Sequence, residues 1–276
     1  MQNNPIGIFD SGFGGLTVMK AVNEILPNES ILYFGDTCNL PYGNKSKESV
    51  IRFTLESSHF LLEKQIKMLI VACHTASCLT LEILQEVLPI PVFGVSVALV
   101  EDLLSLKRKN HVAILSTQAT IASRVYQKLI SEQDPSIQMT SIPCPLFVPL
   151  VEEGFVSHPA TKLIAMEYLH PIANKVDAVL FGCTHYPLLK EVIQDVVGKP
   201  TQLIDPSYAC AIQVKEFLDR NPQMRSSESS YRFFVTDNSS KFQSIGPKFL
   251  GKEIPSVELV SPSQYSHEAL PLSFIS

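Results

Sequence analysis

The chain alternates short apolar, β-branched runs with longer stretches of helical period, and this alternation constrains its fold more than any other feature. The apolar runs are continuous, as is typical of strands that are buried on both faces of a sheet. They cover residues 6–9, 31–34, 68–72, 92–95, 112–115, 179–181, 203–204 and 233–235. The helical stretches cover residues 16–26, 46–64, 80–88, 119–132, 159–174 and 188–197. The pattern predicts an α/β protein built on parallel sheets.

Two segments of the chain share one order of elements. IGIFDSGFGG opens the first segment and VAILSTQATIAS opens the second, each as a strand that ends in a polar residue, Asp10 or Ser116. At a similar distance downstream, each segment has a strand that ends in a cysteine, Cys73 or Cys183. Sequence identity between the segments is low, so the inference depends on element order and spacing. We expect two related α/β units.

Composition limits the classes of partner. The chain has 276 residues and a formal net charge of −5, with a pI of about 5.8, which argues against binding to nucleic acid or to an anionic membrane. No apolar run approaches the roughly 20 residues that a membrane helix needs. The first residues, MQNNPIGIFD, lack the basic flank and apolar stretch of a signal peptide. We therefore expect a soluble, cytoplasmic protein.

Neither a metal site nor a common cofactor is predicted. The six cysteines form no C-x-x-C pair, which argues against zinc binding and against a disulfide scaffold. Residues 12–17 (GFGGLT) lack the third glycine of a dinucleotide fingerprint and the Gly-Lys-Ser/Thr sequence of a nucleotide-triphosphate loop. We expect these glycines to serve a tight turn and close approach of a ligand.

The candidate site lies where the strands end, because ligands of open parallel sheets bind at the carboxyl ends of the strands. The N-terminus of the helix that follows such a strand binds anions, and it favours the thiolate of a cysteine placed there. We therefore expect the pKa of each strand-end cysteine to fall below the usual value of about 8.5. The residues predicted at these ends are Asp10, Ser11, Cys73, Thr75, Ser116, Thr117, Cys183, Thr184 and His185.

Two opposed thiols are suited to inverting a carbon centre. One cysteine, as thiolate, removes a proton from one face of the carbon, and the other, as thiol, returns a proton to the opposite face. Asp10 and His185 are expected to tune the two groups. A Cys–His hydrolase that uses Cys183 and His185 is the competing enzyme hypothesis, but it leaves Cys73 and the repeat unexplained. Each cysteine taken alone is more often a packing residue.

The motifs resemble those of glutamate racemases, in the cofactor-independent aspartate/glutamate racemase superfamily. The resemblance extends over nearly the whole chain, at residues 10–16 (DSGFGGL), 33–43 (YFGDTCNLPYG), 71–77 (VACHTAS), 144–154 (CPLFVPLVEEG) and 182–189 (GCTHYPLL). It implies two pseudo-symmetric parallel-sheet α/β domains, the second inserted into the first, with the active site in the cleft between them. The implied domains are residues 1–97 with 208–276, and residues 98–207.

The resemblance also implies the activity and the site. It implies cofactor-independent interconversion of L- and D-glutamate, which supplies D-glutamate for peptidoglycan. The expected partner is a small-molecule substrate, with a homodimer as a further option. The implied catalytic residues are Cys73 and Cys183 as the acid/base pair, assisted by Asp10, His185 and Glu152. The implied substrate contacts are Asp10, Ser11, Pro41, Tyr42, Gly43, His74, Thr75, Thr117, Thr120, Thr184 and His185.

His74 departs from the family pattern, which has asparagine at this position. Asparagine offers a donor and an acceptor in a small volume, whereas histidine is larger and can carry charge. We expect the ring to crowd the substrate, so that His74→Asn would raise kcat/KM. The departure also leaves open a family member with weakened activity, with activity on aspartate or another amino acid, or with mainly a binding role.

Overall fold

The computed structural model describes residues 4–226, 229–261 and 264, and it has two all-parallel sheets. The first has the strand order β10-β9-β2-β1-β3-β4 and the second the order β6-β5-β7-β8. The first sheet contains β1 (Ile6–Asp10), β2 (Ile31–Gly35), β3 (Met68–Val71), β4 (Val92–Gly94), β9 (Tyr231–Val235) and β10 (Glu258–Leu259). The second contains β5 (His111–Ser116), β6 (Gln138–Pro143), β7 (Ala178–Gly182) and β8 (Gln202–Ile204). The predicted α/β class with parallel sheets is confirmed.

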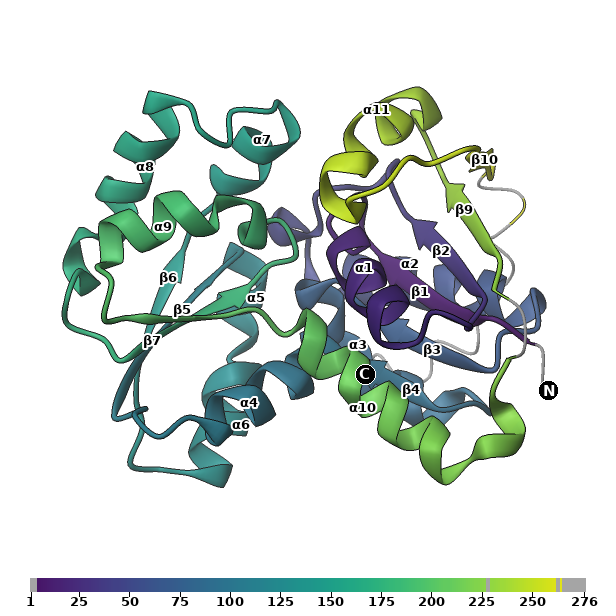
Figure 1. Ribbon diagram of the computed structural model, residues 1–276, viewed down its shortest axis with the longest axis horizontal. Helices are drawn as coiled ribbons and strands as arrows, with labels where there is room; N and C mark the ends of the chain where they lie inside the picture. Colours follow the sequence, from purple (N-terminus) through teal and green to yellow (C-terminus); the bar gives the residue numbers. More distant parts are fainter. Residues whose placement is uncertain (1–3, 227–228, 262–263, 265–276) are drawn as a thin grey trace.

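Each sheet and its helices form one lobe, and the lobes lie side by side in Figure 1. The first lobe has α1 (Leu16–Ile25), α2 (Lys47–Glu63), α3 (His74–Val87), α10 (Ser207–Arg220) and α11 (Ser239–Leu250). The second has α5 (Gln118–Ser123), α6 (Val125–Gln133), α7 (Phe147–Glu152), α8 (Pro159–Leu169) and α9 (Lys190–Val197). The chain passes from the first lobe to the second through α4 (Val95–Ser105), which packs against α10. The expected domain boundaries at 97/98 and 207/208 stay a prediction, and residues 1–3, 227–228, 262–263 and 265–276 of that division lie outside the described part.

Both faces of the first sheet are buried. Successive side chains of a strand point to opposite faces, so each strand contributes to two cores. Ile8 of β1 packs in a core with Met19 of α1 and Phe242 of α11. The next residue, Phe9, packs in a separate core with Phe60 of α2. Apolar residues at every strand position are therefore needed, which explains the continuous apolar runs of the sequence.

Four of the described helices begin at residues whose side chains cap them, and the cap of α8 is His158, whose Nδ1 accepts from the Ala160 amide. The hydroxyl of Ser46 accepts a hydrogen bond from the Ser49 amide at α2, and Thr117 accepts one from the Thr120 amide at α5. Asn238 caps α11 in the same way. Such a cap stabilises a helix by about 1 kcal/mol. Thr117 is thus fixed at the end of β5 by the start of α5.

Some element boundaries differ from those predicted. Residue 95 begins α4 rather than ending a strand, and the helix expected at 80–88 begins at His74. The helix expected at 119–132 is divided at Arg124, whose φ of 55° is left-handed. The Ser123 hydroxyl donates to the Thr120 carbonyl and accepts from the Val125 amide at this break. The helix expected at 159–174 ends at Leu169 and is followed by a short 3-10 turn.

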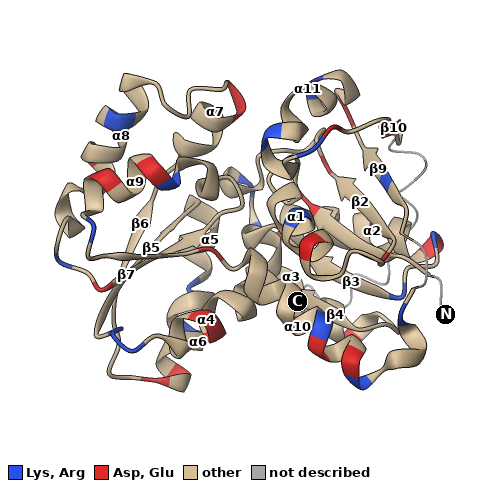
Figure 2. Cartoon of the chain, viewed as in Figure 1, with Lys and Arg blue, Asp and Glu red and all other residues tan. Residues whose placement is uncertain are grey.

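Charged side chains are interspersed over the helices of both lobes (Figure 2). In the described part of the chain, no helix is long and apolar enough to cross a membrane. The expectation of no nucleic-acid partner stays a prediction.

Candidate active site

The two strand-end cysteines face one small cavity between the lobes. Cys73 is the N-cap of α3, after β3, and Cys183 directly follows β7. The cavity is lined by most of the residues predicted from the sequence: Ser11, Pro41, Tyr42, Gly43, Cys73, His74, Thr75, Thr117, Glu152, Cys183, Thr184 and His185. Its volume is about 30 Å³, room for about one or two water molecules.

Two predicted residues lie directly behind the cavity wall. Asp10 is fully buried, and its carboxylate accepts from the Gly12 amide at 2.9 Å and from the Thr184 hydroxyl at 3.5 Å. Thr120 reaches the cavity through Thr75, with 3.0 Å between their hydroxyl oxygens. Gly12, one of the glycines expected to approach a ligand closely, also lines the cavity, whereas the lining residues Leu40, Val148 and Gly182 were not predicted as site residues. They present backbone or apolar surface, which has no pattern of its own in the sequence.

Cys183 is the first member of a relay of three side chains. Its Sγ lies 3.9 Å from Nδ1 of His185, and Nε2 of His185 lies 3.1 Å from Oε1 of Glu152. All three side chains are at most one tenth exposed. The Glu152 carboxylate fixes the His185 ring, so Nδ1 is held in reach of the thiol. Lys241 lies 3.7 Å from the second oxygen of Glu152.

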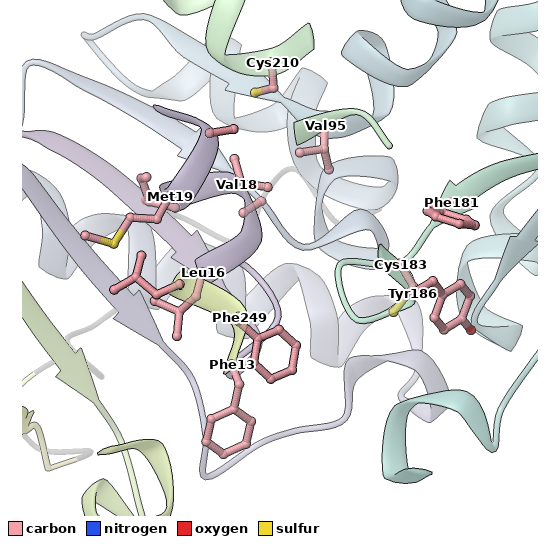
Figure 3. Packing of buried hydrophobic residues seen from close by; sticks show 14 of the residues in the cluster. Phe13, Leu16, Val18, Met19, Val95, Phe181, Cys183, Tyr186, Cys210 and Phe249 are labelled. Carbon is pink, nitrogen blue, oxygen red and sulfur yellow. The ribbon is translucent and has the colours of Figure 1, made fainter. Parts of the chain in front are cut away.

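Cys183 also belongs to an apolar core cluster (Figure 3). Tyr186 lies on the same turn, and Phe13 and Phe249 lie on the facing segments. The Phe249 ring packs edge-on against His185, with 5.2 Å between ring centroids. Burial raises the pKa of the Cys183 thiol well above its ordinary value, and the negative groups nearby add to this, although the His185 amide opposes it.

Cys73 is also a neutral thiol in this structure. Burial and the nearby Asp10 carboxylate raise its pKa to about 11, against hydrogen bonds from Ser11 and the Ala76 amide. The expectation of lowered cysteine pKa values is therefore wrong for both thiols. The start of α3 acts in the expected direction, but desolvation of the thiolate is the larger effect.

The carboxyl of Asp10 is buried, and its charge acts on both Cys73 and Cys183. Burial raises its pKa, while the charge of His185 and the amides of Gly12 and Gly15 lower it. A β-carbon on Gly15 would lie 2.5 Å from Cβ of Asp10, so only glycine admits the carboxyl at this turn. The glycines of the sequence motif thus serve close packing around the site.

Threonines from both lobes meet at the cavity. The Thr75 hydroxyl at the start of α3 lies 3.0 Å from the hydroxyls of Thr117 and of Thr120. The Thr17 hydroxyl lies 3.4 Å from the Thr184 carbonyl. None of the lining residues is lysine or arginine. A bound anion would therefore meet hydroxyl and backbone donors here, as at other helix N-termini.

The segment after β2 forms another part of the cavity wall. The Asp36 carboxylate accepts from the Tyr42 hydroxyl at 2.6 Å, from the Asn39 amide at 3.0 Å and from the Thr236 hydroxyl at 2.9 Å. These bonds fix Pro41, Tyr42 and Gly43 against the cavity. Residue 41 follows a cis peptide bond.

His74 is buried beside Cys73 rather than exposed to solvent. Its Nδ1 is hydrogen-bonded to the Tyr126 hydroxyl of α6. Burial lowers the His74 pKa to about 3, so the ring is neutral at physiological pH. The charged form considered from the sequence is therefore excluded.

No metal site is formed by the described side chains. Over residues 4–226, 229–261 and 264, no set of three His, Cys, Asp or Glu side chains is placed to hold a metal ion. The cysteines are all free, with Cys38 exposed and the other five buried.

The chain is similar to known racemases over almost all of its length. The family model described as Asp/Glu/Hydantoin racemase matches residues 6–214. The glutamate racemase of Chlorobaculum parvum is 42% identical over 93% of this chain and 96% of its own. That of Syntrophus aciditrophicus is 43% identical over 93% and 96%.

Solved structures agree with this. Francisella tularensis glutamate racemase in complex with D-glutamate has a TM-score of 0.90 and 41% identity, covering 96% of this chain and all of that one. The RacE1 glutamate racemase of Bacillus anthracis has a TM-score of 0.90 at 34% identity, over 95% of this chain and 98% of that one. The expectation of an amino-acid racemase is confirmed, and the chain belongs to the Asp/Glu/hydantoin racemase family.

Proposed function

We propose that the protein interconverts L- and D-glutamate by moving the α-proton between Cys73 and Cys183. The observation that carries this proposal is the pair of buried cysteines, each at the end of an equivalent strand, on one cavity between two lobes. The named relatives at about 40% identity are glutamate racemases, which supports glutamate as the substrate. The hydrolase alternative leaves one of the two cysteines without a role.

The proton transfer is a two-base reaction. One cysteine as thiolate removes the α-proton from one face, giving a carbanion, and the second cysteine as thiol gives its proton to the other face. His185 is in reach to exchange a proton with Cys183, and Glu152 orients it. Ser11 and the buried carboxyl of Asp10 are the groups beside Cys73.

Substrate binding must favour ionisation of one of the two thiols. Both thiols have raised pKa values because burial penalises the thiolate. The ammonium group of a bound amino acid brings a positive charge into this buried site, and a nearby opposite charge favours the ionised thiol. The thiolate would thus form when substrate is present, which restricts proton abstraction to the productive complex.

The carboxylates of the substrate would be bound without cationic side chains. The hydroxyls of Ser11, Thr75, Thr117 and Thr184 are the available donors, together with backbone amides at the helix starts. Thr75, now bonded to other hydroxyls, would turn to the ligand. Pro41, Tyr42 and Gly43 form the wall that the substrate backbone would contact.

The lobes must separate to admit the substrate. The cavity, with a volume of about 30 Å³, has room for only about one or two water molecules, which is too little for glutamate with its ten non-hydrogen atoms. We propose that the described arrangement is closed and that binding requires an opening movement between the two sheets.

Supplying D-glutamate for peptidoglycan is the proposed role, in the cytoplasm and without a cofactor. A homodimer stays a prediction. The alternative of a family member with weakened or altered activity is not favoured, because the relatives named glutamate racemase match over 93% of the chain.

Circular dichroism of L-glutamate incubated with pure protein tests the proposal. The signal should decay to zero as the racemate forms, and D-glutamate should decay at a matching kcat/KM. L-aspartate is the matched control substrate, with one methylene less. A stable signal with glutamate, or faster loss with aspartate, would contradict the proposed substrate.

A further inference from the structure

His74 is held from the opposite lobe. It is the first residue of α3, next to Cys73, and lines the cavity. Its Nδ1 is hydrogen-bonded to the hydroxyl of Tyr126, which belongs to α6 of the second lobe. Tyr126 is only 2% exposed, and the two ring centroids are 6.2 Å apart. The bond therefore joins the lobes at the helix that carries Cys73.

The Tyr126 hydroxyl has a second partner on the same helix. It also interacts with the Cys78 thiol, and Cys78 lies one helical turn after His74, on the same face of α3. The hydroxyl can donate to only one of the two. An imidazole nitrogen is a much stronger acceptor than a thiol sulfur, and a thiol is a weak donor. The stronger arrangement has Tyr126 donating to Nδ1 of His74 and Cys78 donating to Tyr126.

This arrangement selects one tautomer of His74. A neutral imidazole carries one proton, so a ring that accepts at Nδ1 carries its hydrogen on Nε2. Its hydrogen-bond partner Tyr126 and its chain neighbour Cys73 both have pKa values raised by burial, so they are neutral at physiological pH. Burial opposes the charged ring. The ring then offers the cavity a neutral N–H donor, which is one of the two functions of an asparagine amide.

We propose that Tyr126 is a positioning residue, whose hydroxyl holds His74 beside Cys73 in the Nε2–H tautomer and so presents a donor to the substrate when the lobes are closed. The inference rests on the proposed racemase function. It makes His74 and Tyr126 a functional pair, in which neither residue is expected to act alone. A displacement of about 1 Å beside a reacting centre can change a rate by about 100-fold, so loss of the hydroxyl should be measurable.

A double-mutant cycle tests the pair through kinetics. Tyr126→Phe should lower kcat/KM for glutamate by about tenfold, and His74→Asn should lower it as well. In the His74→Asn background, Tyr126→Phe should change kcat/KM less than twofold. Tyr168→Phe is the matched control, since its hydroxyl only accepts from the Leu146 amide at 3.4 Å near the surface, and it should retain full activity.

Three kinetic outcomes would overturn the pairing. Equal losses from Tyr126→Phe in both backgrounds would mean that Tyr126 acts through stability or packing. No loss in the wild-type background would mean that its hydroxyl has no role. A rise in kcat/KM with His74→Asn would mean that the ring crowds the substrate, as the sequence alone suggested. Melting temperatures measured in parallel separate a folding defect from a loss of rate.

Nitrogen-15 NMR of histidine-labelled protein tests the tautomer independently of activity. The resonances that disappear in His74→Asn identify His74. They should show a protonated Nε2 and an unprotonated Nδ1 at every pH from 6 to 9, and Tyr126→Phe should shift the Nδ1 resonance. A proton on Nδ1, or titration near neutral pH, would refute the proposal. If wild-type protein failed to racemise glutamate, the proposed function would fail while this measurement would still decide the tautomer.

Discussion

Gly43 and Thr117 belong to different lobes and meet at the cavity with no room for a side chain between them. A β-carbon on Gly43 would lie 2.5 Å from Cβ and 2.6 Å from Cγ2 of Thr117. Thr117 cannot move away easily because its hydroxyl caps α5. The glycine therefore sets how closely the two lobes approach.

Gly43→Ala should hinder closure of the lobes without unfolding either one. We expect kcat/KM for glutamate to fall by about 100-fold, in line with a displacement of about 1 Å at the site. Steady-state kinetics with a thermal melt measure both effects. Unchanged kinetics would show that the lobes are not required to approach this closely.

Cys73→Ala and Cys183→Ala should each abolish racemisation, with a loss of at least about 1000-fold, because each removes the group that exchanges the α-proton on one face of the substrate. In D₂O, each variant should still exchange the α-proton of one enantiomer, and the two variants should prefer opposite enantiomers. Proton NMR of the substrate measures this exchange. Full racemisation by either variant would rule out the two-thiol mechanism.

Glu152→Gln should lower kcat about tenfold by loosening His185. The equilibrium constant between enantiomers is one, so kcat/KM must fall equally in both directions. The asymmetry should appear in the primary deuterium isotope effect, which should grow for the enantiomer whose proton Cys183 removes. Isotope effects that change alike for both enantiomers would refute an action through Cys183 alone.

Stability should fall at alkaline pH because buried thiols resist ionisation. Burial raises the Cys210 pKa from 9.0 to about 12, so the folded state keeps a proton that the unfolded chain loses. The free energy of unfolding therefore falls as pH rises from 9 to about 12, by up to about 1.4 kcal/mol per pH unit for this group. In urea denaturation, the free energy of unfolding of Cys210→Ala should fall less steeply with pH above pH 9 than that of the wild type. The substitution should lower the free energy of unfolding at pH 7 by about 1 kcal/mol. Cys38→Ala, at an exposed position, is the control, and a slope unchanged by Cys210→Ala would contradict this assignment.

Dialysis against EDTA should leave racemisation unchanged. In the described part of the chain no group of His, Cys, Asp or Glu side chains could hold a metal ion, and thiols perform both proton transfers in the proposed mechanism. Activity that was lost on dialysis and restored by zinc would contradict it.

The sequence predicted the buried strands well because their continuous apolar runs reflect burial on both faces. It missed β6 (Gln138–Pro143), an edge strand with no buried residue and no apolar run. It also missed the break at Arg124, because helical period continues through that residue. Periodicity records which faces are buried, and it says little about local backbone turns.

In the site, too, features that depend on the local sequence could be predicted, and those that depend on contacts between distant segments could not. Cys73 and Cys183 could be predicted because each ends a strand. The contact of Glu152 with His185 depends on how α7 packs, so only the family resemblance suggested it. Tyr126 had no signal at all, since a tyrosine on an amphipathic helix usually belongs to the core. The cysteine pKa values were misjudged because burial of the two thiols depends on how the two lobes pack together.

The neutral state of the two cavity thiols also determines how readily they react with electrophiles. Thiolates, rather than thiols, react with alkylating agents, and both cavity cysteines are buried with raised pKa values. Such agents should reach the exposed Cys38 first and leave activity intact. A covalent inhibitor of this enzyme would therefore need a cationic group of its own beside the warhead, so that it creates the nucleophile that it is meant to trap.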